Sequence, residues 1–426
     1  MPMSADRRFA FVAWGSLGDV HPYVALAQAM HRRGHRVIFA THPLLEGMVR
    51  NAGLEFRPIG AHIDTEAVLH HPKLWDARKG FEIVWGSVAP LQRSIADLLL
   101  GLPGDTVIVA HPLVLPGAAM ARDRQPGLRL IGSYLAPANL RSCEDPLWLG
   151  PLHVPRWLPH AVRRWLWRRV DADLLDPVTV PGINAQRAAM GLAPIVHYAE
   201  HLYAAPDHAF TFFPEWFCPT QPDWPRPLLR GDFPLFDGFP EAEANADLAA
   251  FLAAGEPPLA FTFGSAMVQA DKAFRASVEA CLRLGRRGIL LTAFPDQLPR
   301  DLPPSVRWFD YVPFRRLLPQ VAALVHHGGI GSTAEALRAG VPQLVVPMAH
   351  DQFDNAARVV ALGVGATLPR PRYDGARVAK ALAPLLASAE VRQRCRSAAA
   401  HFTDPHPVET LCGRIEAALS AMECRA

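Results

Sequence analysis

The sequence predicts an α/β protein made of two doubly wound domains, each with a parallel sheet covered by helices. Short apolar runs of strand length alternate with stretches of helical spacing in both halves of the chain. Glycine-rich turns directly follow apolar runs near Gly15 and Gly328. A stretch crowded with prolines, 218–240, separates the two halves and favours a stiff extended connection.

The elements follow the same order in each half. A strand, a turn over 15–22 and a helix ending near Gly34 open the chain, and a second strand follows directly. The strands expected along the chain are 9–14, 35–41, 106–110, 128–133, 259–263, 288–292, 322–325 and 343–346. We therefore expect a first domain over 1–225, a proline-rich linker over 226–245 and a second domain over 246–406.

Composition excludes several classes. A length of 426 residues is too great for one core, and half of the residues are apolar, which indicates a folded protein. The net charge of +3 indicates no nucleic-acid partner. The six cysteines form no CxxC pair or zinc-like cluster, so we expect reduced thiols in the cytoplasm. The chain shows no signal sequence and no apolar stretch of spanning length, so a soluble or peripheral protein is expected.

The segment 322–355 carries the most specific pattern. A buried strand leads into a glycine-rich turn and a helix start at Ser332, where unpaired N–H groups stabilise an anion. His327 adds a donor before the glycines, and the polar residues from Asp351 to Asn355 suit sugar hydroxyls. An ordinary strand–helix unit, whose glycines only make the turn, is the alternative.

The order of these residues along the segment resembles the nucleotide-sugar signature of the GT-B glycosyltransferases of family 1. The resemblance implies two domains facing across a cleft, with the donor mainly on the second, and a final helix, 407–426, that packs back on the first. It implies no cofactor other than the nucleotide-sugar co-substrate. The donor-binding residues that it implies are Gly18, Ser265, Val312, His327, Gly329, Gly331, Ser332, Thr333, Glu335, Asp351 and Gln352.

The loop 15–22 lies at the carboxyl end of the first expected strand, where ligands of parallel sheets bind. It resembles the GSxGDxxP loop of bacterial antibiotic and sterol glycosyltransferases, which implies that Asp19 is the general base. An alcohol needs such a group because it is a poor nucleophile at neutral pH. A helix cap is the structural alternative for Asp19, and His21 is the rival base.

The implied reaction is inverting and independent of metal, since the helix start and His327 face the charge that grows on the leaving diphosphate. Asp171 and Asp173 form a DxD string like the metal-binding motif of another glycosyltransferase fold. The string lies in an arginine-rich helical stretch, so we interpret it as solvated surface and expect no metal site.

Several strings narrow the resemblance to the rhamnosyltransferase chain of rhamnolipid synthesis: 71–76, 213–228, 231–238 and 350–363. This implies dTDP-L-rhamnose as donor and a 3-(3-hydroxyalkanoyloxy)alkanoic acid as acceptor, giving mono-rhamnolipid. Trp75, Phe81 and Trp85 are the acceptor-wall candidates, although helical spacing of the last two fits core packing equally. The alternatives are a UDP- or dTDP-sugar transferase for a sterol, polyketide or carotenoid, and a catalytically silent auxiliary protein.

A basic and aromatic region precedes the middle of the chain. Trp148, Trp157, Trp165 and Trp167 lie among arginines at 156, 163, 164, 168 and 169. The mixture suits an interfacial helix, and a helix packed on the first domain explains it as well. Peripheral contact with the inner face of the cell membrane, and a protein partner that supplies the acceptor lipid, belong to the same hypothesis.

Overall fold

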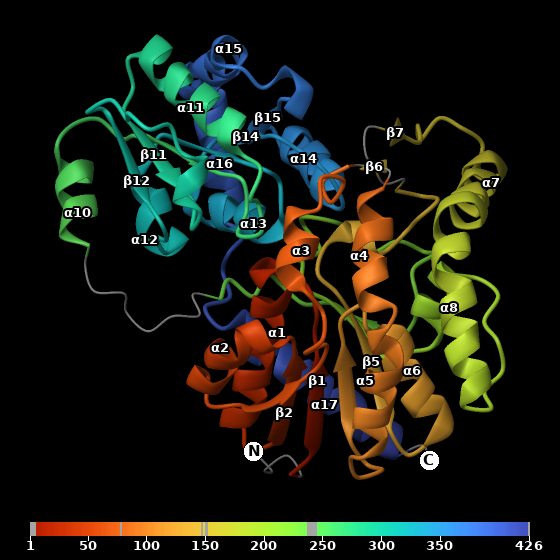
Figure 1. Ribbon diagram of the computed structural model, residues 1–426. Helices are drawn as coiled ribbons and strands as arrows, with labels where there is room; N and C mark the ends of the chain where they lie inside the picture. Colours follow the sequence, from red (N-terminus) through yellow and green to blue (C-terminus); the bar gives the residue numbers. More distant parts are fainter. Residues whose placement is uncertain (1–5, 77–78, 146–147, 150–151, 237–244, 425–426) are drawn as a thin grey trace.

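Two parallel sheets, each covered by helices, form the architecture of the computed structural model (Figure 1). The structure describes residues 6–76, 79–145, 148–149, 152–236 and 245–424. In both large sheets, every strand pair that the described residues form is parallel, as the sequence predicts.

The first sheet has the strand order β3-β2-β1-β4-β5-β8-β9. Its strands are β1 (Arg8–Val12), β2 (Arg36–Thr41), β3 (Glu55–Pro58), β4 (Val107–Ala110), β5 (Arg129–Tyr134), β8 (His208–Thr211) and β9 (Leu228–Leu229). Both faces are covered, and the period-2 alternation of β1 shows how. Phe9 and Phe11 enter the apolar cluster on one face, whereas Ala10 and Val12 enter the cluster on the other.

The second sheet has the order β12-β11-β10-β13-β14-β15. Its strands are β10 (Leu259–Thr262), β11 (Gly288–Leu291), β12 (Val306–Phe309), β13 (Ala323–His326), β14 (Gln343–Val345) and β15 (Gly365–Thr367). A short antiparallel pair, β6 (Trp148–Leu149) and β7 (Leu152–His153), lies apart from both sheets.

Helices flank each sheet (Figure 1). Those that precede β9 are α1 (Leu17–Arg32), α2 (Glu46–Asn51), α3 (Thr65–His70), α4 (Gly80–Val88), α5 (Leu91–Leu100), α6 (Leu115–Arg124), α7 (His160–Val170), α8 (Asp176–Ala189) and α9 (Tyr198–Ala204). A π-helical turn, Asp171–Leu175, joins α7 to α8. Those that follow are α10 (Ala246–Ala253), α11 (Asp271–Leu284), α12 (Phe314–Leu317), α13 (Ile330–Ala339), α14 (Gln352–Ala361), α15 (Gly375–Ala387), α16 (Ala389–Ala399) and α17 (Pro407–Glu423).

The last helix, α17, packs against α1 of the first sheet. Its buried side chains, including Leu411 and Ile415, belong to the same apolar cluster as Phe9. Glu416 is 8% exposed and is bound by the Arg33 guanidinium at 2.8 Å and by His35 at 2.9 Å. The apolar face of α17 is buried and the Glu416 carboxylate is hydrogen-bonded, and both features stabilise the packing of α17 against α1.

The proline-rich segment does more than connect the sheets. Within the expected linker, β9 adds an edge strand to the first sheet, and Phe233 is buried. Phe233 and Trp224 pack in one cluster with Leu337 of α13 and Val359 of α14. The remainder of the expected linker, 237–244, lies outside the described residues.

An ion-pair network also joins the two lobes, which are the parts of the molecule built on the first and the second sheet. Arg358 of α14 contacts Asp354 on its own helix at 2.8 Å and Asp145, from the loop after β5, at 3.1 Å. Asp145 is 8% exposed and Asp354 is 2% exposed, and the Arg358 guanidinium bridges these two buried carboxylates, of which Asp145 also pairs with Arg156. Removing one partner of such a group leaves an uncompensated buried charge.

Candidate active site

Asp19 lies in the first turn of α1, at the carboxyl end of β1. Ser16 is the N-cap residue, and the Asp19 carboxylate accepts hydrogen bonds through Oδ2 from the Ser16 backbone N–H at 2.7 Å and its hydroxyl at 2.8 Å. Both bonds use one oxygen, and no described residue donates a hydrogen bond to Oδ1. Asp19 is therefore a capping residue that keeps one carboxylate oxygen for other chemistry.

Gly15 is what makes room for this carboxylate. Its φ is +139°, which L-residues with a side chain rarely adopt. A Cβ atom at this position would lie 2.7 Å from Cγ of Asp19. The sharp turn after β1 thus needs glycine for the backbone and for the space that Asp19 fills.

His111 is a neighbour of this site that the sequence analysis missed. It is the first residue after β4, the strand beside β1, and its backbone N–H donates to the Val12 carbonyl at 2.9 Å. The ring is 5% exposed and packs edge-on against Tyr23, which lies one turn after Asp19, with centroids 5.7 Å apart. Burial lowers the pKa of His111 to about 4, although the charge of Asp19 opposes this shift. The sequence feature that could have identified His111 is its place as a polar residue directly after a predicted strand.

His21 lies on a different side of α1 from Asp19, because two residues turn a helix by about 200°. Its ring contacts Phe236 with centroids 5.6 Å apart, and burial lowers the pKa of His21 to about 4. The structure therefore brings Asp19, and not His21, to the loop edge that adjoins His111.

The glycine-rich turn holds His327 tightly. Cβ atoms added at Gly264 and Gly329 would lie 3.1 Å and 2.6 Å from its ring, so the imidazole lies between the two turns that follow β10 and β13. Burial lowers the pKa of His327 to about 4, so the ring is neutral at pH 7. Its Nδ1 atom is buried and has no hydrogen-bond partner among the described residues.

The start of α13 presents backbone donors beside this histidine. Gly329 is the N-cap residue, and the Thr333 amide is bonded to its carbonyl oxygen at 3.0 Å. The amides from Ile330 to Ser332 precede the first intrahelical bond, which leaves them for a ligand. Gly331 is exposed and Ser332 is half-buried.

The side chain of Thr333 corrects one expectation. It is fully buried, and its hydroxyl donates to the Gly329 carbonyl at 3.0 Å. This hydroxyl therefore belongs to the helix and does not face a ligand.

The loop after β14 is tied to the glycine turn. The Asn355 amide group donates to the Gly328 carbonyl at 2.9 Å and to Oδ2 of Asp351 at 2.7 Å. Gln352, which is 3% exposed, accepts from the backbone amides of Met348 and Ala349 at 2.8 and 3.1 Å. These bonds fix the position of the Asp351 carboxylate.

Asp351 and Asp19 come from different lobes and lie close enough to interact. Burial, together with the negative charge of Asp19, raises the pKa of Asp351 to about 7. The loop after β1 and the loop after β14 therefore face each other. This juxtaposition defines the site between the lobes.

The other expected donor residues lie in four different segments: α1, the turn after β10, the loop after β12 and α13. Gly18 and Ser265 are exposed in the first turn of α1 and after β10, respectively. Glu335 is 8% exposed and its carboxylate binds Arg338 at 2.7 Å. The Val312 side chain is 5% exposed within an apolar cluster, which leaves only its backbone for contact with a ligand.

The three acceptor-wall candidates have different environments. Trp85 is 2% exposed and packs against Tyr198, with centroids 5.2 Å apart, so this residue belongs to the core. Phe81 stacks on Trp85 and is only half-buried. Trp75 meets His350 of the second lobe edge-on at 6.0 Å, and the φ of His350 is +58°, an unusual value for a non-glycine residue.

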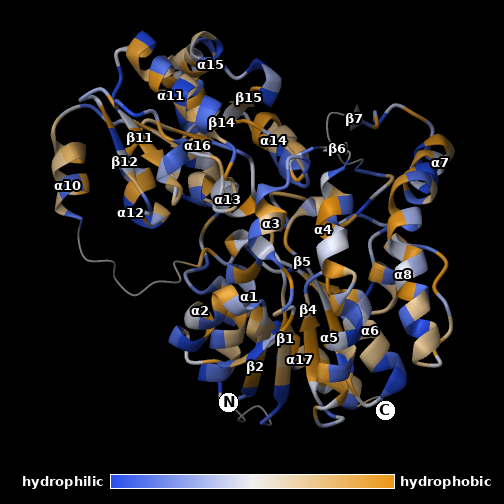
Figure 2. Ribbon diagram, in the orientation of Figure 1, coloured by the Kyte–Doolittle hydropathy of each residue, from blue (hydrophilic) through white to orange (hydrophobic). Residues whose placement is uncertain are grey.

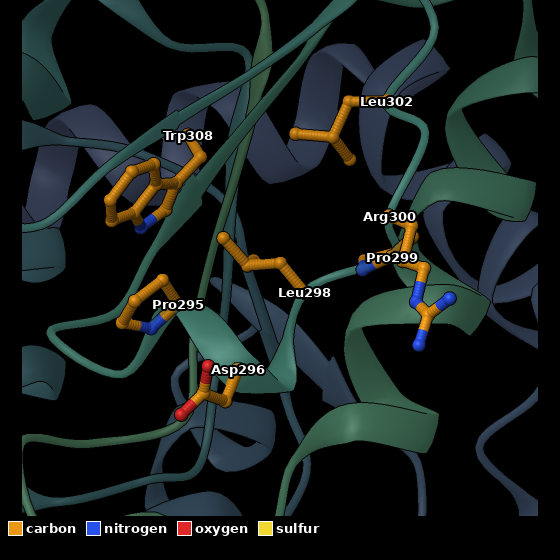
Figure 3. Close-up of a pocket in the computed structure, with 7 residues that line it drawn as sticks. All are labelled: Pro295, Asp296, Leu298, Pro299, Arg300, Leu302 and Trp308. Atoms are coloured by element: carbon orange, nitrogen blue, oxygen red, sulfur yellow. The ribbon is translucent and has the colours of Figure 1, made fainter.

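Trp308 of β12, four residues before Val312, lines a surface cavity of about 540 Å³. Figure 3 shows its indole above the Pro295 ring, with Leu298 beside both. Trp308 is 37% exposed, and its Nε1 donates to the Thr292 carbonyl at 2.9 Å.

The DxD string differs from the solvated surface that we expected. Asp171 is 6% exposed and pairs with Arg141 at 2.5 Å, whereas Asp173 pairs with Arg169 on the surface. Within the described ranges, no group of three His, Cys, Asp or Glu side chains is arranged to hold a metal ion.

Comparisons with known proteins agree with this architecture. Residues 9–102 match the glycosyltransferase family 28 N-terminal domain, and residues 289–417 match the erythromycin biosynthesis protein CIII-like C-terminal domain. The chain is 28% identical over 429 residues to O-mycaminosyltylonolide 6-deoxyallosyltransferase of Streptomyces fradiae, covering 96% of this chain and 97% of that relative.

Two solved structures share the fold. The calicheamicin glycosyltransferase CalG4 aligns with a TM-score of 0.69 at 21% identity, covering 97% of this chain and 98% of that one. The spinosyn rhamnosyltransferase SpnG, complexed with thymidine diphosphate, aligns with a TM-score of 0.63 at 21% identity, covering 95% and 98%. The two parallel sheets have the GT-B fold of these structures, and the two domain matches and the full-length relative identify the chain as a glycosyltransferase.

Proposed function

We propose that this enzyme transfers a sugar from a dTDP-sugar to a hydroxyl group of a hydrophobic small-molecule aglycone, with inversion at the anomeric carbon. The observation that carries the proposal is the approach of Asp19 to Asp351 across the two lobes, which is close enough to affect the pKa of Asp351. A base and a sugar-binding carboxylate are thereby supplied to one site from opposite sides.

In the proposed reaction, Asp19 is the general base. Its Oδ2 is held by Ser16, so Oδ1 accepts the proton of the acceptor hydroxyl as the new C–O bond forms. The bond between the anomeric carbon and the diphosphate breaks on the opposite side of the sugar. His21, on another side of α1, is the weaker candidate for this role.

The leaving diphosphate is assigned to the turn after β13. Negative charge grows on it in the transition state, and the amides of Gly331 and Ser332 at the start of α13 are placed to stabilise that charge. Neutral His327 adds one N–H donor. We assign Asp351 and Gln352 to the sugar hydroxyls, and the Val312 backbone to the base.

The donor assignment has two supports. The sequence strings resemble a dTDP-L-rhamnose enzyme, and the structural neighbour SpnG is a rhamnosyltransferase complexed with thymidine diphosphate. We therefore place dTDP-L-rhamnose first among donors. The acceptor assignment follows the full-length relative, whose name describes transfer to O-mycaminosyltylonolide, and this favours a small aglycone over a hydroxyacyl lipid dimer.

The test offers the purified enzyme dTDP-L-rhamnose, dTDP-glucose or UDP-glucose together with a macrolide aglycone, a sterol or a 3-(3-hydroxyalkanoyloxy)alkanoic acid. Products are identified by mass, and the anomeric configuration is read by NMR. Transfer from a dTDP-sugar to the macrolide or sterol, unaffected by EDTA, is expected. Transfer only from UDP-glucose would overturn the donor assignment, and transfer only to the hydroxyacyl lipid would restore the rhamnolipid hypothesis. Donor binding without transfer to any acceptor would favour a silent auxiliary protein.

A further inference from the structure

Four large apolar side chains in and around α7 are exposed although the helix is anchored to the first lobe. Trp157 is 80% exposed, Trp165 58%, Leu174 55% and Val162 38%. Among the other described residues, exposed apolar side chains of this size are scattered along the chain from Leu44 to Val360. The region around α7 therefore concentrates apolar surface in contact with water.

The helix has an inner and an outer face. Trp167 is 5% exposed, and its Nε1 donates to the Ser142 carbonyl at 3.0 Å. The Arg141 guanidinium lies 5.2 Å from the centre of the same indole. At about 100° per residue, Val162, Trp165 and Arg169 fall on the side away from this contact, whereas Arg164 and Arg168 fall together on one flank of the helix, about 60° and about 100° from Trp167.

The flank beside this outer face carries positive charge. Arg164 and Arg168 are exposed, and neither has an ion-pair partner within the described ranges. Arg169 pairs with Asp173 at 2.6 Å, with both side chains about half exposed. Surface arginines beside exposed indoles are the combination that binds anionic headgroups, because indole rings favour the interface and the cations neutralise lipid charge.

The position of α7 connects this face to the acceptor side of the enzyme. Ser142, which binds Trp167, lies in the loop that leaves the carboxyl end of β5, at the same edge of the sheet as Asp19. Figure 1 shows α7 at the margin of the first lobe, on the side away from α10 to α12. Figure 2 shows both hydrophilic and hydrophobic residues along it. None of the described helices is long and apolar enough to cross a bilayer.

We propose that the outer face of α7 and its arginine-bearing flank dock on an anionic lipid surface, with Trp157 and Trp165 inserted at the headgroup level and Arg164 and Arg168 in contact with lipid phosphates. The docked enzyme lies at the interface without spanning it. A hydrophobic acceptor dissolved in the bilayer then reaches the first lobe without crossing water. This last consequence rests on the proposed function, whereas the docking itself does not.

The full-length protein is sedimented with vesicles of phosphatidylcholine alone or with added phosphatidylglycerol. Binding to the anionic vesicles that weakens at high salt is expected. The Trp157→Ala/Trp165→Ala variant should bind at least about tenfold more weakly, since two interfacial anchors are lost. Arg164→Gln/Arg168→Gln should lose about fivefold for each arginine on anionic vesicles and little on neutral ones.

The matched control is Leu44→Ala/Val196→Ala, which removes two side chains of similar exposure, 73% and 74%, elsewhere on the surface. It should bind vesicles like the wild type. Equal binding by wild type and the tryptophan variant, or no binding to anionic vesicles, would overturn the proposal. Self-association in solution that the tryptophan variant abolishes, measured by analytical ultracentrifugation, would instead make this face an interface between copies.

The assay needs neither donor nor turnover. Loss of vesicle binding with intact transfer to a water-soluble acceptor, or the reverse, separates this inference from the proposed function.

Discussion

Replacing Asp19 with Asn tests the proposed base with little disturbance of the fold. The carbonyl oxygen of the substituted amide can accept the same two bonds from Ser16 that the Asp19 carboxylate accepts at 2.7 and 2.8 Å, so the helix start is preserved. Only the negative charge and the proton-accepting oxygen are lost. Loss of a charge at a helix start costs about 0.3–1 kcal/mol of stability.

The catalytic effect should be far larger than the effect on folding. Removing a general base typically lowers the rate by about 10²- to 10⁴-fold. At about 1.36 kcal/mol for each factor of ten, the transition state loses roughly 2.7–5.4 kcal/mol. The donor contacts proposed for the second lobe do not involve Asp19, so the donor Kd should stay within about twofold.

The assay combines kcat at saturating donor and acceptor, donor Kd by calorimetry and Tm for folding. Gly15→Ala is the companion variant, because its Cβ would displace the Asp19 carboxylate while the charge remains. It should lower kcat too, with a further loss of stability from the φ of +139°. Turnover of Asp19→Asn within about threefold of wild type would refute the reasoning and return His21 to consideration.

Three further predictions concern the second lobe. Gly331→Ala should raise the free energy of unfolding by about 0.5–1 kcal/mol, since no atom lies within 4 Å of the added methyl. The same methyl should weaken donor binding because it occupies the side of the helix start that is assigned to the diphosphate. An unchanged donor Kd by calorimetry would contradict this. The raised pKa of Asp351 means that its contribution to stability is full below its ordinary value of 3.8 and is lost as pH rises through about 7. Asp351→Asn should therefore show a flatter Tm profile over this range than wild type, and parallel profiles would disprove the assignment. Arg358→Ala should lower the free energy of unfolding, measured in urea, by about 3–5 kcal/mol. The control Arg394→Ala breaks an exposed ion pair and should lower it by less than about 1 kcal/mol. Similar losses in the two variants would refute the role of the buried network.

The sequence alone identified most of the fold because the strands of doubly wound sheets are apolar on both faces. The four strands expected in the first half overlap β1, β2, β4 and β5, and the four in the second overlap β10, β11, β13 and β14. The missed strands lie at or near the sheet edges. β12 exposes Arg307 and Trp308, and β15 is half-buried, so neither carries the apolar run that marks a central strand.

Side-chain environments were less accessible. Trp85, Trp165 and Trp167 follow similar helical patterns, yet two are buried and one is exposed. The difference arises from partners distant in sequence, such as Tyr198 for Trp85 and Ser142 for Trp167. Asp171 was expected to lie in solvent because its ion-pair partner, Arg141, lies 30 residues earlier and the residues around Asp171 do not reveal it.

What the sequence by itself determined is the local chemistry: an acid at the start of α1, a glycine turn with a neighbouring histidine, and a helix start with unpaired amides. These depend on residues a few positions apart, which backbone geometry brings together in any context. Only the tertiary structure decided that Asp19 lies near Asp351 and His111, and that α7 turns Trp165 outward and Trp167 inward. Those relations depend on packing between distant segments, and neither periodicity nor spacing along the chain encodes which surfaces meet.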